Sequence, residues 1–100
     1  MKETGRNGFQ TKVIEALEEE FKGCIVLLND ASLFQGVPDL LVLFNDRWAA
    51  LEVKKSTKAA RQPNQEYWTN KFDEMSFGAF ISPENKEEVF YALRQTFGVI

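Results

Sequence analysis

The stretch GVPDLLVLFNDRWAALEVK (residues 36–54) decides the fold of this 100-residue chain. Two apolar runs flank Asn45-Asp46, a pair typical of a two-residue hairpin turn, and both runs are rich in strand-forming residues. Counting outward in register from this turn places Asp39 directly opposite Glu52. Directly opposed residues have Cβ atoms about 4.5–5.5 Å apart, so the sequence predicts that two carboxylates meet on one face of a hairpin.

The second predicted strand adds a lysine to this pair. Side chains alternate along a strand, so Lys54 shares the face of Glu52, two residues before it. Simpler interpretations exist for each residue taken alone: Asp39 could cap a turn at the strand start, and Lys54 could serve only as the salt-bridge partner of Glu52. The alternation predicts one face toward the core, made of Ala49, Leu51 and Val53, and an opposite face made of Trp48, Ala50, Glu52 and Lys54.

Two carboxylates beside a lysine are the minimal set for binding a divalent cation and cutting a phosphodiester. Asp39 and Glu52, with the backbone carbonyl of Val53, would hold Mg²⁺, which would polarise the scissile phosphate and lower the pKa of a bound water. Lys54 would orient that water and stabilise the developing charge. The chain has no histidine and one cysteine, which excludes histidine acid–base chemistry and the usual zinc sites and favours Mg²⁺ or Mn²⁺.

A basic segment follows the predicted hairpin. Lys55, Lys58 and Arg61 come after Lys54, and no acidic residue intervenes before Glu66. The net charge of −3 and the pI near 5.0 argue weakly against a nucleic-acid partner, but phosphate binding depends on the local field more than on the net charge. The segment is either a solvated loop with scattered lysines or a DNA-binding surface next to the predicted cluster.

A helix that is predicted to begin at Pro63 carries a further candidate. Gln65 and Trp68 are three residues apart and therefore neighbours on one helical face. Gln65 could donate to a phosphate or hold an attacking water. Trp68 is more simply explained as a core residue.

The pattern along the chain predicts one α/β domain over residues 1–100. Apolar residues at helical spacing indicate a first and a last helix, and residues 24–29, CIVLLN, suit a buried strand in which Cys24 is a small buried hydrophobe. A helical crossover between strands in so short a chain implies a mixed sheet packed by helices. The predicted elements are a helix over about 9–22, strands over 24–29, 38–44 and 48–54, loops over 30–37 and 55–62, a helix from 63 to about 75, a strand over 77–81 and a final helix opened by residues 82–85.

Size and hydropathy make two further predictions. A chain of 100 residues builds a modest core and gains from an apolar partner surface, so a homodimer is expected. No apolar stretch is long enough to span a bilayer and the N-terminus lacks the apolar region of a signal peptide, so we expect a cytoplasmic protein with no membrane partner.

The motifs together resemble a known group of enzymes. Gly-x-Pro-Asp, then Glu-x-Lys, then Gln-x-x-Trp in a following helix is similar to the PD-(D/E)xK nuclease superfamily, in particular the small stand-alone phage members of its virus-type replication–repair nuclease (VRR-NUC) branch. The likeness covers about residues 9–95. It implies a restriction-endonuclease-like αβββαβ core, dependence on Mg²⁺ or Mn²⁺, cleavage of DNA phosphodiesters, and a homodimer that acts on branched or junction DNA.

The resemblance also implies roles for individual residues. Asp39 and Glu52 match the metal ligands of the family, Lys54 matches its catalytic lysine, and Gln65 matches its downstream glutamine.

The first helix departs from the family pattern. The family commonly places a glutamate shortly before a glutamine near the start of this helix, whereas no acid stands just before Gln10 here. Glu15 is then the best inward candidate for the third acid, and Glu3 is a more distant one.

Three hypotheses about function follow. The main one is a metal-dependent DNA endonuclease that acts as a homodimer on structured, Holliday-junction-like DNA. The second is a catalytically weak or silent DNA-binding module of the same fold, in which the missing acid has removed activity. The third is a structural subunit in which Glu52 and Lys54 form an ordinary ion pair.

Overall fold

The computed structural model describes residues 5–29 and 34–99, and its elements follow the predicted order. The helix α2 has the predicted bounds, and the hairpin strands are slightly shorter than predicted at their outer ends. Part of the predicted loop 30–37 lies outside the described residues. The elements are α1 (Gly5–Glu20), β1 (Ile25–Leu28), β2 (Leu40–Phe44), β3 (Arg47–Val53), α2 (Pro63–Met75), β4 (Gly78–Ile81) and α3 (Lys86–Phe97).

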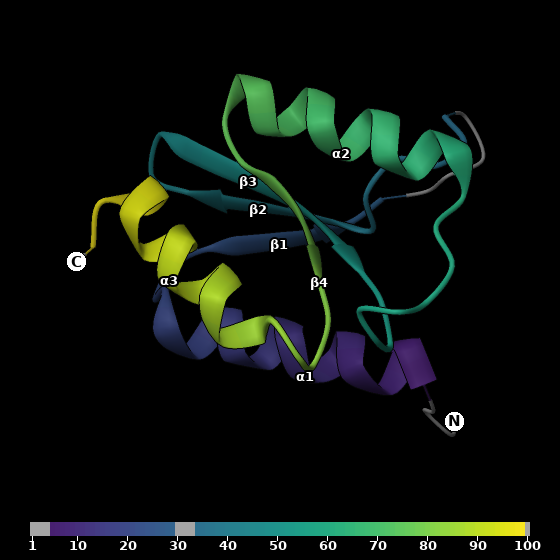
Figure 1. Cartoon of the computed structure of the whole chain (residues 1–100). Helices are drawn as coiled ribbons and strands as arrows, with labels where there is room; N and C mark the ends of the chain where they lie inside the picture. The colour runs from purple at the N-terminus through teal and green to yellow at the C-terminus, as the bar shows by residue number, and fades with distance from the viewer. Residues whose placement is uncertain (1–4, 30–33, 100) are drawn as a thin grey trace.

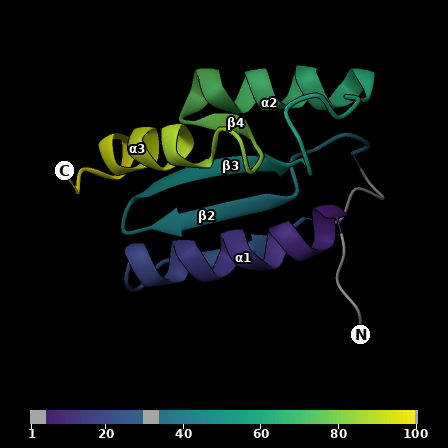
Figure 2. The same ribbon diagram turned by 60° about the horizontal axis from the view of Figure 1, so that its bottom comes forward.

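The four strands form one mixed sheet flanked by helices, as predicted. The strand order is β1-β2-β3-β4, with antiparallel pairs from β1 to β3 and a parallel pair between β3 and β4. The helix α2 connects β3 to β4 and lies on one face of the sheet, while α1 and α3 lie on the other (Figures 1 and 2). The chain therefore has the α/β architecture that the sequence pattern indicates.

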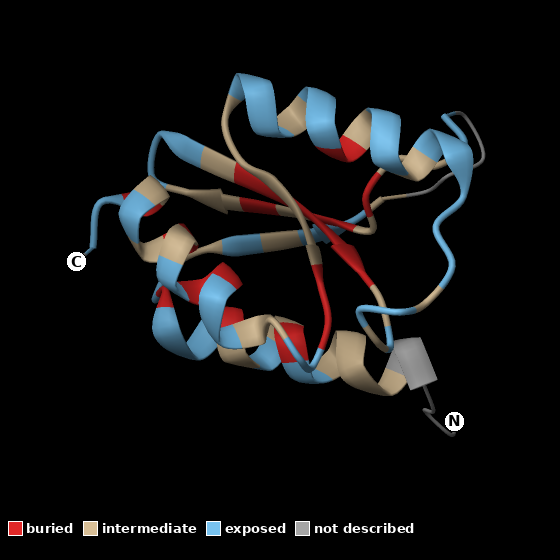
Figure 3. Ribbon diagram, viewed as in Figure 1, coloured by how far each residue is buried: buried red, intermediate tan, exposed pale blue. Residues whose placement is uncertain are grey.

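The main core lies between the sheet and the pair α1 and α3. Every second residue of β2 and β3 belongs to it, which confirms the predicted core face of β3. Figure 3 marks the buried residues along the strands and helices. The ring of Phe21 packs edge-on against that of Phe97, with centroids 5.1 Å apart, and Arg94 of α3 donates to Glu20 of α1. The buried members are Val13, Leu17, Phe21, Leu40, Val42, Ala49, Leu51, Val53, Ile81, Val89, Phe90, Leu93 and Phe97.

The hairpin forms in the predicted register. Asn45 adopts a positive φ of 57°, as the first residue of such a turn requires, and Phe44 pairs with Arg47. The last ladder pair of β2 and β3 joins Leu40 to Leu51. One step further along this register lies the position at which Asp39 faces Glu52.

The prediction that residues 24–29 form a buried strand is wrong. β1 is an edge strand of the sheet, and its side chains remain exposed to 55% at Ile25, 45% at Leu27 and 63% at Leu28. The helix α2 lies over β3 and β4 and leaves this part of the sheet uncovered (Figure 1). An apolar run shows that a strand forms, but it does not say whether a second layer covers the strand.

Cys24 is half-buried rather than buried, and it is not an activated nucleophile. Its thiol donates to the backbone carbonyl of Leu17 over 3.6 Å. Partial burial, together with the nearby Glu18 carboxylate, raises the pKa of the Cys24 thiol above its ordinary value. A raised pKa keeps the sulfur protonated near neutral pH, which agrees with the packing role expected from the sequence.

Within residues 5–29 and 34–99, every helix is too short or too polar to cross a membrane.

Candidate active site

Asp39 is held at the start of β2 by bonds on both sides. Its Oδ2 accepts a hydrogen bond of 2.9 Å from the backbone N–H of Val53, and its backbone carbonyl accepts one of 2.8 Å from Asn29. Pro38 immediately before it is buried, and its ring fixes its own φ at about −65°. These bonds place the Asp39 carboxylate against the Glu52–Val53 end of β3, as the hairpin register predicts.

Glu52 is a buried carboxylate within an apolar strand. Its side chain is 1% exposed, between the fully buried Leu51 and Val53. The side-chain amide of Gln65, in the first turn of α2, donates to Glu52 Oε2 over 2.8 Å. Removing a carboxylate from water costs several kcal/mol unless hydrogen bonds or a cation compensate. Burial of Glu52 therefore carries a cost in free energy that an apolar strand residue would not have, which makes Glu52 a candidate functional residue.

Gln65 joins the carboxylate to the lysine. While its nitrogen donates to Glu52, its Oε1 accepts hydrogen bonds from Lys54 Nζ at 2.7 Å and from the backbone N–H of Gln62 at 2.9 Å. Lys54 Nζ also donates to the carbonyl of Ala60 over 2.9 Å. One amide side chain thus bonds to both the Glu52 carboxylate and the Lys54 ammonium group and orients both. Because Lys54 shares this partner with Glu52, it lies on the face that the alternation predicts.

Gly36 lets the loop before Asp39 pack directly on the start of α2. Its φ is +90°, and a Cβ added there would lie only 2.5 Å from the Cβ of Asn64. Only glycine adopts this conformation without cost and fits in this space. The contact fixes Asp39 and Gln65 relative to each other, and beside it opens a hollow of about 410 Å³ lined by Gln35, Gly36, Gln62, Pro63, Asn64 and Gln65.

The prediction that Glu15 faces inward from the first helix is wrong. Glu15 is exposed, and it lies two residues from both Val13 and Leu17, which form the core-facing side of α1. With 3.6 residues per turn, a residue two positions away points to the opposite side of the helix. Glu3, the more distant candidate, lies outside the described residues.

The basic segment contributes two exposed lysines and one arginine that is partly engaged. Lys55 and Lys58 are exposed. The guanidinium of Arg61 lies 3.7 Å from the ring centroid of Phe80, and its Nη1 is 3.2 Å from a Glu66 carboxylate oxygen. Arg61 therefore carries less free charge toward a phosphate than the sequence suggests.

Glu84 ties this segment to the loop before α3. Its Oε1 accepts a hydrogen bond of 3.2 Å from the backbone N–H of Thr57. The backbone N–H of Glu84 itself, and then that of Thr57, lower the pKa of the Glu84 carboxyl. Because the pKa is lowered, the carboxylate keeps its charge at neutral pH, and this tie weakens only when the pH falls into the acidic range.

The donor set suits a hard divalent cation. Among the described residues no three His, Cys, Asp or Glu side chains lie close enough to hold a metal together, so Asp39 and Glu52 are the two carboxylates that this site offers to a cation. Mg²⁺ is commonly bound by one or two carboxylates, with water and substrate phosphate completing its shell. The residues present therefore fit Mg²⁺ or Mn²⁺, and the third oxygen, from the Val53 carbonyl, stays a prediction.

The sequence did not indicate the backbone partners of the site. The Val53 N–H bond to Asp39, the Ala60 carbonyl that receives Lys54 and the Gln62 N–H bond to Gln65 all depend on main-chain positions. Main-chain groups are the same in every residue, so no sequence pattern distinguishes them.

Comparison with known proteins supports the fold. No family model matches the chain, and no curated protein matches it. A solved structure described as "VRR_NUC domain protein" superposes with a TM-score of 0.65, covering 95% of this chain and 92% of the other, at 16% sequence identity. The chain therefore has the fold of a VRR-NUC domain, which confirms at the level of the fold the resemblance drawn from its motifs.

Proposed function

We propose that the protein is a metal-dependent DNA endonuclease that hydrolyses phosphodiester bonds in structured or branched DNA as a homodimer. The observation that carries the proposal is the Gln65 side chain, which bonds to the buried Glu52 carboxylate and to the Lys54 ammonium beside Asp39. A salt bridge that served only stability would not need an amide to orient both partners. The structural similarity to a VRR_NUC domain protein supports the same proposal of a nuclease.

Each residue has a separate task in this proposal. Asp39 and Glu52 hold the cation, and Mg²⁺ or Mn²⁺, when bound, supplies positive charge against the scissile phosphate. The ammonium group of Lys54 stabilises the negative charge that builds up on the phosphate and orients the attacking water. Gln65 is a positioning residue, because it holds Glu52 and Lys54 at a fixed separation before substrate arrives.

The exposed lysines next to the site are proposed to bind the DNA backbone. Lys55 and Lys58 stand beyond the end of β3, within four residues of Lys54, so a phosphate at the cluster would lie close to both. Arg61 adds a smaller contribution because it is already stacked on Phe80. Such contacts release counterions, so binding should weaken steeply as salt is raised.

The homodimer explains how one small chain could cut both strands of a junction. Each copy carries one cluster of Asp39, Glu52, Lys54 and Gln65, and a twofold axis would present two clusters to a symmetric four-way junction. We further propose that the protein acts in the cytoplasm.

A second candidate function has its own support. Within the described residues no acid of α1 joins Asp39 and Glu52, since Glu15 points away from the core. Weak metal binding would turn the protein into a catalytically weak or silent DNA-binding module that keeps the fold and the lysines.

The test compares supercoiled plasmid, linear duplex and a synthetic four-way junction, each with Mg²⁺, Mn²⁺ or EDTA. We expect cleavage with either metal, strongest on the junction, and none with EDTA. Failure to cut any substrate with either metal at high protein concentration would overturn the nuclease and leave the binding module and the structural subunit.

The substitution Glu52→Gln sharpens this test because it removes the charge and keeps the shape. Cleavage should fall by more than about 100-fold, since even groups that only orient metal ligands are worth about 10–100-fold. DNA binding should be retained or become tighter, because the repulsion between carboxylate and phosphate is removed. Glu74→Gln, at an exposed glutamate of the same helix as Gln65, is the matched control and should leave cleavage unchanged.

A further inference from the structure

The loop that follows β3, residues 55–62, returns to the end of that strand. Near its far end the Ala60 carbonyl accepts a hydrogen bond of 2.9 Å from Lys54 Nζ, and the second acceptor of this ammonium group is Gln65 Oε1, at 2.7 Å. A lysine side chain is a flexible stem with a compact charge at its tip, so its direction depends on the acceptors that hold it. Lys54 is therefore oriented by one acceptor from α2 and one from this loop.

The loop contains no helix or strand, so tertiary contacts decide its course. Near its start the Thr57 N–H donates to Glu84 Oε1 over 3.2 Å. At its end the Gln62 N–H donates to Gln65 Oε1 over 2.9 Å. The part of the loop between these two anchors includes Arg61, whose side chain makes further contacts.

Arg61 contacts two elements at once. Its guanidinium carbon lies 3.7 Å from the ring centroid of Phe80 on β4, and its Nη1 lies 3.2 Å from Glu66 Oε2 in the first turn of α2. A guanidinium group is planar, so it can stack on an aromatic ring while its N–H groups donate to a carboxylate. A lysine ammonium group has no such plane. The Arg61 side chain therefore ties the loop to β4 and to α2.

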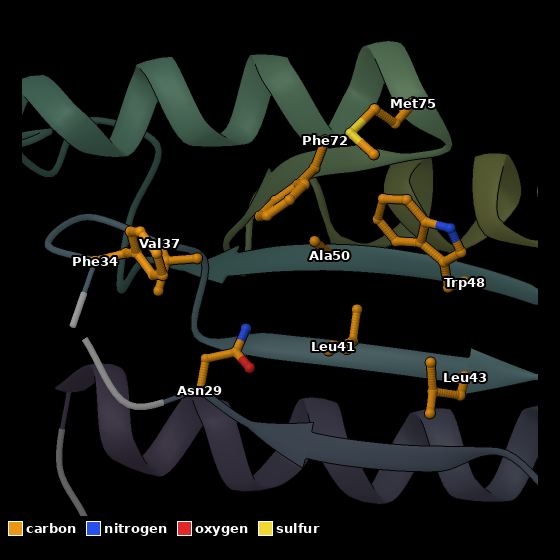
Figure 4. Close-up of a pocket in the computed structure, with 9 residues that line it drawn as sticks. All are labelled: Asn29, Phe34, Val37, Leu41, Leu43, Trp48, Ala50, Phe72 and Met75. Carbon is orange, nitrogen blue, oxygen red and sulfur yellow. The ribbon is translucent and has the colours of Figure 1, made fainter. Parts of the chain in front are cut away.

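The ring beneath Arg61 lies on the same face of the sheet as the acidic pair. Phe80 pairs with Glu52 across the parallel ladder, and paired residues of neighbouring strands point to the same side of the sheet. Figure 4 shows an apolar groove of about 510 Å³ on this face, under the last turns of α2. Phe80 is not among the described residues that line the groove, so its ring supports Arg61 rather than forming a wall of the groove.

We infer that Arg61 is a positioning residue for Lys54. The Ala60 carbonyl and the Cα of Arg61 belong to one planar peptide unit, so the contacts that hold Arg61 also hold this carbonyl. The carbonyl in turn holds Lys54 Nζ. The inference rests on the proposed function, in which Lys54 stabilises the charge on the phosphate, and it adds the residue that sets the direction of Lys54. The main role of Arg61 is then to hold the loop rather than to bind DNA.

The substitution Arg61→Lys tests the inference, because it keeps the positive charge and removes the planar stack. The kcat for junction cleavage should fall by about 10-fold, since a shift of about 1 Å in a catalytic group can cost about 100-fold and Gln65 still holds Lys54. KM and its salt dependence should stay unchanged. Phe80→Leu, which removes the ring and keeps an apolar strand residue, should act in the same way. A raised KM with an unchanged kcat in Arg61→Lys would instead show that Arg61 acts by binding a phosphate, and would overturn the inference.

A second measurement needs neither DNA nor cleavage. Lysines of the free protein are methylated with formaldehyde and cyanoborohydride, and mass spectrometry of peptides gives the rate at each position. Lys54 is half-buried and held by two acceptors, so it should react more slowly than the exposed Lys55. In Arg61→Lys and in Phe80→Leu the rate at Lys54 should rise several-fold. Lys86, which is also half-buried, should keep its rate, and this distinguishes release of Lys54 from a general loosening of the fold.

Arg47→Lys is the matched control, since Arg47 stands at the other end of β3 and its Nη1 donates to the Thr96 carbonyl over 2.9 Å. It should leave both kcat and the methylation rate at Lys54 unchanged. A rate at Lys54 that stays at the wild-type value in both Arg61→Lys and Phe80→Leu would overturn the inference, whether or not the protein cuts DNA. A protein that cuts no DNA, but in which both variants release Lys54, would refute the nuclease and support the role of Arg61 in holding Lys54.

Discussion

The α2 side of the sheet carries two unlike surfaces a few residues apart. At one end Asp39 and Glu52 form a polar cluster under the first turn of α2, and further along Leu41 and Trp48 line an apolar groove under its last turns. Alternation along β2 and β3 places all of these side chains on the same face. The same helix serves both surfaces, with Gln65 at its start and Met75 at its end.

The two surfaces differ in how they are completed. Hydrogen bonds are directional, so the polar cluster needs partners at set positions, and its own chain supplies them through Gln65 and the Val53 N–H. The hydrophobic effect is not directional and depends on buried area, so any apolar surface of the right shape can cover the groove. A chain of this size can therefore build the polar cluster itself, whereas the groove stays apolar and partly exposed.

The largest effect is expected for Gln65→Ala, which tests whether the chain's own side chains complete the polar cluster. It removes the bonds to Glu52 and to Lys54, and we expect cleavage to fall by about 10–100-fold, as for other residues that orient metal ligands. The Mg²⁺ concentration for half-maximal activity should rise as well, because Glu52 is no longer held in place. Steady-state cleavage of a junction across an Mg²⁺ series measures both effects.

The control for this prediction is Gln95→Ala, at an exposed glutamine of α3. It should leave the Mg²⁺ dependence unchanged. A Gln65→Ala protein with normal activity and normal Mg²⁺ dependence would show that this side chain does not position the acid.

An intermediate effect is expected at Gly36, which joins the loop before Asp39 to α2. Gly36→Ala should lower the free energy of unfolding by about 2 kcal/mol, since a non-glycine residue at positive φ costs about 1–3 kcal/mol and the new Cβ also meets Asn64. That change corresponds to a drop in Tm of about 10 °C for a domain of this size. Calorimetry measures it.

Gly23→Ala separates the cost of a positive φ from the cost of a steric contact with α2. Gly23 has a nearly equal φ of +91°, but a Cβ there meets nothing within 4 Å. It should lower the Tm by less than Gly36→Ala and leave cleavage unchanged. Equal losses of stability at the two positions would mean that the contact between Gly36 and α2 does not hold the cluster together.

The smallest effect is expected from the exposed lysines. The double substitution Lys55→Ala and Lys58→Ala should weaken DNA binding several-fold and reduce the slope of log affinity against log salt by about 1–2, because each phosphate contact contributes about 0.9. A fluorescence titration at several salt concentrations gives the slope. The pair Lys12→Ala and Lys22→Ala, at exposed positions on α1 and just after it, removes the same charge and should leave the slope unchanged.

Much of the site could be predicted from the sequence, because the hairpin that carries Asp39, Glu52 and Lys54 is formed by residues close together in the chain. The Asn45-Asp46 turn sets the register of the hairpin, and that register alone brings Asp39 to Glu52. The spacing of Glu52 and Lys54 then follows from strand alternation. The exposure of β1 has the opposite character, because it depends on which neighbouring layer covers the strand, and the residues of the strand carry no record of that. The outward direction of Glu15 could have been predicted, because its spacing from Val13 and Leu17 places it on the opposite side of the helix.

The sequence by itself determined the hairpin, the pairing of its acids, the bounds of α2 and the mixed sheet, because turn chemistry and side-chain periodicity act over a few residues. Only the tertiary structure decided that Gln65 reaches both Glu52 and Lys54 and that one half of a sheet face stays open. Both outcomes depend on where α2 lies across the strands. That position results from packing between segments distant in the chain, where small contacts such as that of Gly36 with Asn64 fix the geometry.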